Sequence, residues 1–152
     1  RSRDLKTRAY HRLKDDVPEE VKRERHSRLR EYHYSNAFLL NQAQIGEVQL
    51  LLVEGVSKRS LTELQGRNNG FTKIIFPDKL IPDLTSSGTV RKPVKGDYVA
   101  ALVTSCTSTV LRGVPLAILP LQEFYAGTMA EQLSSLVTAH RYSTRGSGNC
   151  RT

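Results

Sequence analysis

Two basic turns carry the side chains best suited to binding chemistry in this chain. The first turn, with Lys58 and Arg59, closes a continuous apolar run that begins after Gly46. The second turn follows closely with Arg67 and Asn68. Cationic and amide side chains neutralise and hydrogen-bond phosphate oxygens, so they suit a polyanion. We expect the second turn to lie near the first and to form one cationic surface with it; ordinary solvated turns are the alternative interpretation.

Further side chains could enlarge this surface. Phe71 follows Asn-Asn-Gly, and an aromatic ring in such a turn suits stacking on a nucleic-acid base. Phe76 follows two isoleucines, so core packing is the better interpretation for it. Later basic residues offer more phosphate contacts, although each alone is typical of any charged surface. The candidate RNA-binding residues are Lys58, Arg59, Arg67, Asn68, Phe71, Lys73, Arg91, Lys92 and Lys95.

The sequence shows no constellation for catalysis or metal binding. Its serines lack the G-x-S-x-G context of a nucleophile. His26 and His33 share a helix face but are spaced too widely for a typical metal pair. Cys106 and Cys150 are far apart and form neither a zinc nor an iron–sulfur motif. We therefore expect no catalytic residue, no metal site and no cofactor held by this chain.

The composition favours a small, basic binding domain. The 152 residues are 38% hydrophobic and include no Trp, which is enough for one modest core. A formal net charge of +8 attracts nucleic acid, anionic membranes or acidic proteins, and solubility alone also explains a modest excess. No apolar stretch approaches the length of a membrane span, so we expect no membrane partner. The chain begins at Arg1, within a basic run, and we expect it to be part of a longer polypeptide.

Short strands separated by turn residues are predicted for the middle of the chain. Clusters of Gly, Pro, Asn and Asp separate the apolar runs. The expected strands lie near residues 47–54, 61–65, 72–76, 97–105 and 110–118. Five short strands of this kind fit a mainly β, OB-like barrel, and a small sandwich is the competing architecture.

A charged helix is expected before the barrel and an atypical tail after it. Acidic residues around Pro18 are typical of a helix start, and the arginine-rich helix should run to about Tyr34. Residues 120–140 have the periodicity of an amphipathic helix, weakened by Gly127. The last dozen residues have a composition typical of disorder.

Several of these segments together resemble a known family. One part of the chain, Lys6-Thr7, Ala9-Tyr10 and residues 15–22, resembles the end of a radical-SAM methylthiotransferase core. A second part resembles the TRAM domain that follows such a core. It comprises residues 46–59, 66–68, 74–77 and 96–99. The whole pattern is most similar to MiaB-like tRNA methylthiotransferases, in the eukaryotic Cdk5 regulatory subunit-associated branch. His26, where the family usually has leucine, and the tail after Leu119 depart from it.

The resemblance implies a division of the chain into four parts. These are the end of the radical-SAM core with the charged helix (1–35), a connector (36–45), the TRAM domain (46–119) and the atypical tail (120–152). It also implies a parent enzyme that converts N6-isopentenyladenosine beside the tRNA anticodon to its 2-methylthio derivative. That enzyme would use 4Fe-4S clusters and S-adenosylmethionine held by upstream cysteines, so we expect this chain alone to be inactive.

The resemblance also implies the partners and the compartment. The expected partners are tRNA and the catalytic core of the same polypeptide. The alternative function is a protein-interaction module that binds a regulatory partner, for which residues 121–140 offer a hydrophobic face. The expected localisation is mitochondrial, or else cytoplasmic or nuclear.

Overall fold

The computed structural model describes residues 16–85 and 89–145, with side chains through His140. The chain divides into two compact units, Arg1–Ser35 and Asn36–Thr152. The first described element is helix α2 (Glu19–Ala43). None of the helices in the described part of the chain combines the length and apolar character that crossing a membrane requires.

Helix α2 is longer than the sequence suggested. Glu19 and Glu20 lie in its first turn, where carboxylates complement the helix dipole. The expected end near Tyr34 is wrong, because α2 continues through the expected connector to Ala43. The added segment contains two Ala, two Leu and one Gln, which favour helix, and the first strong stop is Gly46 in a left-handed conformation (φ +92°).

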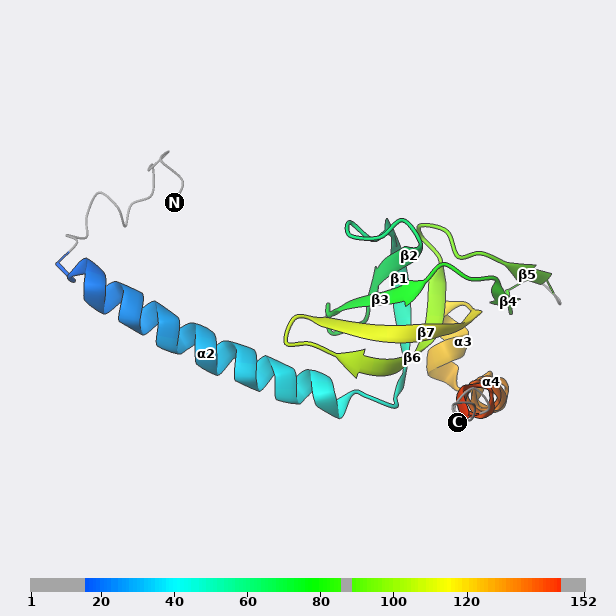
Figure 1. Ribbon diagram of the computed structural model, residues 1–152. Coiled ribbons are helices and arrows are strands. Elements are labelled where there is room, and N and C mark those ends of the chain that lie inside the picture. Colours follow the sequence, from blue (N-terminus) through cyan, green and yellow to red (C-terminus); the bar gives the residue numbers. More distant parts are fainter. Residues whose placement is uncertain (1–15, 86–88, 146–152) are drawn as a thin grey trace, which may run out of the picture. The chain divides into compact units, whose positions relative to one another are not determined.

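Five strands close into a mixed β-barrel, as Figure 1 shows. They are β1 (Val48–Val56), β2 (Glu63–Arg67), β3 (Lys73–Pro77), β6 (Tyr98–Cys106) and β7 (Val110–Ile118). The order around the barrel is β3-β2-β1-β6-β7, and a parallel pairing of β7 with β3 closes it. The other neighbours pair antiparallel. The predicted mainly β, five-stranded, OB-like fold is therefore confirmed; the bounds of β7 are as predicted and those of the other four strands differ by one or two residues.

Two short strands were missed by the sequence analysis. These are β4 (Ile81–Asp83) and β5 (Thr89–Arg91), which form an antiparallel pair beside the end of β7. No strand is predicted between residues 76 and 97, where Pro82 and Gly88 are typical of turns. Three-residue strands are too short to show a period-two pattern, so tertiary pairing decides their conformation.

Alternate residues of the strands fill the barrel. Phe76 is 1% exposed, which confirms the prediction of core packing for this ring. The other side chains of this core are Leu51, Val53, Leu64, Ile74, Ile81, Val99, Ala101, Val103, Leu111 and Ile118. Gly66 lets β2 approach β1 closely, because a Cβ atom there would lie 2.8 Å from the carbonyl oxygen of Leu52.

A second apolar cluster joins the tail to the outside of the barrel. Helices α3 (Leu121–Ala126) and α4 (Ala130–Arg145) follow β7, and Leu133 of α4 is buried against barrel residues such as Leu50 and Leu102. The predicted amphipathic helix is in fact two helices, because Gly127 adopts φ +73° and ends α3. Disorder of the last dozen residues is wrong for residues 141–145, which are helical, and residues 146–152 lie outside the described part.

Candidate nucleic-acid interface

The two basic turns lie at opposite ends of strand β2. Leu64 at the start of β2 pairs with Val56, next to the first turn, whereas Arg67 at its end pairs with Leu52. A five-residue strand therefore separates them, a length of roughly 17 Å. The expectation that the turns form one surface is wrong, because successive turns of consecutive antiparallel strands alternate between the ends of a sheet.

The first turn instead meets two other loops. The backbone N–H of Asp78, just after β3, donates to the carbonyl of Thr62 in this turn at 3.0 Å. Lys92 Nζ, on the loop after β5, reaches Asp78 Oδ2 at 2.8 Å. The same loop returns to β1, where the Gly96 N–H donates to the Val53 carbonyl at 3.0 Å. These contacts bring together five exposed basic residues, which we call the cationic end: Lys58, Arg59, Lys79, Lys92 and Lys95.

Most charges of the cationic end are not neutralised within the protein. Lys92 pairs with Asp78, but in the described part of the chain no ion pair engages the other four basic side chains. Sequence reasoning missed Lys79. The position of Lys79 directly after Pro77-Asp78 indicates an exposed turn. The sequence does not show that this turn lies at the cationic end, because that depends on the hydrogen bond between Asp78 and Thr62.

Arg91 is bound by two carboxylates within the fold. Its Nε donates to Asp83 Oδ2 at 2.6 Å, and its two terminal nitrogens contact the Asp97 carboxylate at 2.5 and 3.1 Å. These bonds tie β5 to β4 and to the turn before β6. Because its main donors are used internally, the structure does not support the prediction that Arg91 extends the binding surface.

The two carboxylates of this network have lowered pKa values. For Asp83, burial acts to raise the pKa, but hydrogen bonds from Thr85 and Arg91 outweigh it. For Asp97, the hydrogen bond from Arg91 lowers the pKa against a smaller effect of burial. Both partners in turn raise the pKa of Arg91, so all three groups stay charged near neutral pH.

The remaining candidates gather at the other end of β2. Arg67 pairs with Glu54 at 2.9 Å and contacts Phe71, while Lys73 stands opposite Arg67 on β3. Asn68 has a structural role, because its amide donates to Gln49 at 2.7 Å and its Oδ1 accepts the Thr72 N–H at 2.8 Å. This group is separate from the cationic end.

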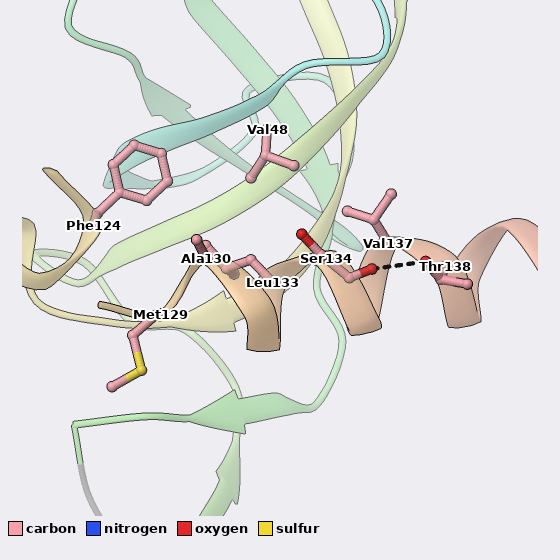
Figure 2. A pocket seen from close by; sticks show the side chains of 8 residues that line it. All are labelled: Val48, Phe124, Met129, Ala130, Leu133, Ser134, Val137 and Thr138. Carbon is pink, nitrogen blue, oxygen red and sulfur yellow. Dashed lines mark hydrogen bonds between the residues drawn. The ribbon is translucent and has the colours of Figure 1, made fainter. Parts of the chain in front are cut away.

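An apolar pocket of about 460 Å³ lies where α3 and α4 meet the start of β1 (Figure 2). Phe124 lines it from α3, Leu133 from α4 and Val48 from the barrel, and Met129 lines it from the turn between the two helices. The Thr138 hydroxyl donates to the Ser134 carbonyl at 2.9 Å, so this polar group is satisfied within α4. Residues 121–140 thus bury Leu133 against the barrel, while the other apolar side chains that pack there, Phe124, Met129, Leu136 and Val137, stay partly exposed.

Comparison with known proteins agrees with this architecture. Residues 42–116 match the model of the TRAM domain. The human mitochondrial tRNA methylthiotransferase CDK5RAP1 is 52% identical over 108 residues, which are 71% of this chain and 18% of the human protein. A CDK5RAP1-like protein of Caenorhabditis elegans is 41% identical over 107 residues, 70% of this chain and 18% of that protein.

A bacterial relative extends the similarity. The tRNA-2-methylthio-N(6)-dimethylallyladenosine synthase of Xanthomonas oryzae is 36% identical over 101 residues, 66% of this chain and 18% of the synthase. The chain thus spans 18% of the length of each of these relatives. With its barrel, its TRAM match and these identities, the chain belongs to the CDK5RAP1 branch of the MiaB-like family and contains its C-terminal, TRAM-bearing part.

Proposed function

We propose that this chain is the tRNA-binding end of a tRNA methylthiotransferase and that it holds tRNA through the cationic end of its barrel. The observation that carries the proposal is the convergence of three loops that bring Lys58, Arg59, Lys79 and Lys95 to one end, where none of the four forms an ion pair with residues 16–85 or 89–140. The names of the relatives, which are tRNA methylthiotransferases and a related synthase, support tRNA as the polyanion.

The proposed binding is electrostatic and orienting. Basic side chains that neutralise phosphates release condensed counterions, so affinity falls as salt rises. Such contacts fix the position of an RNA but carry little base information. The TRAM domain would therefore place the tRNA, while the whole enzyme selects N6-isopentenyladenosine beside the anticodon and converts it to the 2-methylthio derivative.

The cofactors implied for the whole enzyme do not fit the residues of this chain. A 4Fe-4S cluster needs several cysteine thiolates close together. Cys106 is half-buried at the end of β6 and packs against the barrel core, and Cys150 is far from it in the sequence. We therefore assign no chemical step to this chain and expect it to be inactive alone; the family resemblance and the name of the human relative favour a mitochondrial location.

A salt-dependence measurement tests the proposal. The double variant Lys58→Gln with Arg59→Gln should bind tRNA more weakly, and its plot of log affinity against log salt should be flatter by roughly 1.5 to 2. Binding can be followed by fluorescence anisotropy of a labelled tRNA between low and physiological salt. An unchanged slope would contradict the assignment of this surface.

A matched arginine separates a local effect from a change in total charge. Arg112 lies on the outer strand surface and pairs with Glu63 at 2.8 Å. Arg112→Gln removes the same charge as Arg59→Gln, yet it should leave the slope nearly unchanged. Equal effects of the two single variants would mean that only net charge matters and that no specific interface exists.

A further inference from the structure

The turn between β2 and β3 holds an exposed aromatic ring in a strained conformation. Phe71 is 73% exposed and has φ +62°, and it is the single non-glycine residue with positive φ in the described part of the chain. A bulky residue is rarely found in this left-handed region. Strained residues persist where the surroundings over-determine them, and they cluster at functional sites.

Hydrogen bonds on both sides of Phe71 impose this conformation. The Phe71 N–H donates to the carbonyl of Asn68 at 3.0 Å, and the Asn68 N–H donates to the carbonyl of Thr72 at 3.2 Å. The Asn68 side chain closes the turn again by accepting the Thr72 N–H. The turn therefore presents the ring in a fixed orientation, although burial of the ring contributes little to the fold.

Arg67 supports one face of the ring. Its guanidinium carbon lies 4.0 Å from the ring centroid, and NH1 donates to the Phe71 carbonyl at 3.0 Å. Glu54 on β1 fixes the guanidinium from the other side through a 2.9 Å contact with Nε. Since the ring is mostly exposed although a cation covers one face, we take the other face to be open to solvent.

The surroundings of the ring favour a nucleobase over an apolar protein surface. The other residues of the turn are Asn68, Asn69, Gly70 and Thr72, so the ring is not part of an apolar patch within this turn. Lys73 stands directly opposite Arg67, and directly paired residues lie on the same face of a sheet. While Glu54 neutralises Arg67, Lys73 has no ion pair among the described residues and can meet a phosphate.

We propose that Phe71, supported by Arg67, is a stacking platform for one unpaired base of the bound RNA. A planar base fits the open face, because every base offers a π-surface and stacking needs no particular base identity. Lys73 would contact the phosphate beside that base. This inference rests on the proposed RNA-binding function, but it assigns a second contact at the end of the barrel opposite the cationic end.

Variants at Phe71 separate stacking from a purely structural role. Asn tolerates the left-handed conformation, so Phe71→Asn should keep or raise the thermal midpoint while it weakens RNA binding by roughly 5- to 150-fold. Phe71→Trp should retain affinity. The matched control is Tyr125→Leu, which removes another exposed aromatic ring, 60% exposed on α3. This variant should leave the RNA affinity unchanged.

The probe is an RNA hairpin with one 2-aminopurine in its single-stranded loop, titrated with the whole chain. We expect its fluorescence to change on binding to the wild type and Phe71→Trp, and much less with Phe71→Asn. Wild-type affinity and fluorescence change in Phe71→Asn would overturn the inference. Phe71→Asn could behave like wild type while Lys58→Gln with Arg59→Gln still flattens the salt slope. In that case the stacking proposal is wrong and the proposed tRNA-binding function stands. If the wild type itself fails to bind RNA, the proposed function fails as well.

Discussion

Replacing Arg91 by glutamine tests whether this residue holds the fold together or contacts RNA. The side chain of Arg91 is 37% exposed, but those of its partners Asp83 and Asp97 are only 3% and 18% exposed. Glutamine is shorter and neutral, so both carboxylates would lose their cationic partner. The substitution should therefore destabilise the barrel where β4, β5 and the start of β6 meet.

The size of the effect follows from the number and exposure of the contacts. Removing one partner of a fully buried ion pair costs about 3–5 kcal/mol, whereas exposed pairs contribute about 0–1 kcal/mol. Arg91 lies between these limits, and Asp83 keeps its two hydrogen bonds from Thr85. We expect a loss of about 2 kcal/mol, which for an m-value of about 1.3 kcal/mol/M lowers the urea midpoint by roughly 1.5 M.

The loss should depend on pH in a defined direction. Asp83 and Asp97 have pKa values below their ordinary value of 3.8, so their contribution to stability is present above about pH 4 to 5. It disappears as pH falls through the lowered pKa values, because both carboxylates become protonated. The urea midpoints of wild type and Arg91→Gln should therefore differ at pH 7 and approach each other as the pH falls below 3.8 and through the lowered pKa values.

Urea unfolding at several pH values and tRNA binding at several salt concentrations complete the test. Arg91→Gln should leave the salt slope of binding unchanged at temperatures where the variant is folded. A normal urea midpoint together with a flatter salt slope would refute the structural assignment and restore Arg91 to the interface.

Two further substitutions test the two apolar clusters. Gly66→Ala should destabilise the barrel by more than about 2 kcal/mol in thermal unfolding, because its Cβ would lie 2.8 Å from the Leu52 carbonyl oxygen. In the control Gly70→Ala, the new Cβ meets no atom closer than 3.6 Å, so the thermal stability should be nearly unchanged. Leu133 is 8% exposed, so Leu133→Ala should lower the free energy of unfolding by about 2–3 kcal/mol in urea and increase amide exchange in α4. The control Leu121→Ala, at a side chain 42% exposed, should lower it much less. Equal losses would show that α4 does not depend on the Leu133 contact.

Local patterns were sufficient to predict much of the fold. The apolar runs of β1 and β6 predicted strands because turn residues separate them from the rest of the chain. Phe76 was correctly assigned to the core from its apolar neighbours alone. The end of α2 was misjudged because a change from charged to apolar residues does not stop a helix; only glycine or proline, or a competing tertiary contact, does so.

Composition and local spacing determined that the chain has a basic, mainly β domain with exposed cationic turns, since charge and period-two patterning are properties of the sequence itself. Which charges act together was decided by the tertiary structure. Because β1 to β3 run antiparallel, Arg67 and Lys58 lie at opposite ends of β2. The hydrogen bond between Asp78 and Thr62 places Lys79 at the cationic end. The fold places two carboxylates, 8 and 6 residues away in the sequence, around the guanidinium of Arg91. They bind its donors, so Arg91 does not join the cationic end. Such contacts depend on strand register and loop closure, which link residues through space and leave no periodic signal in the chain.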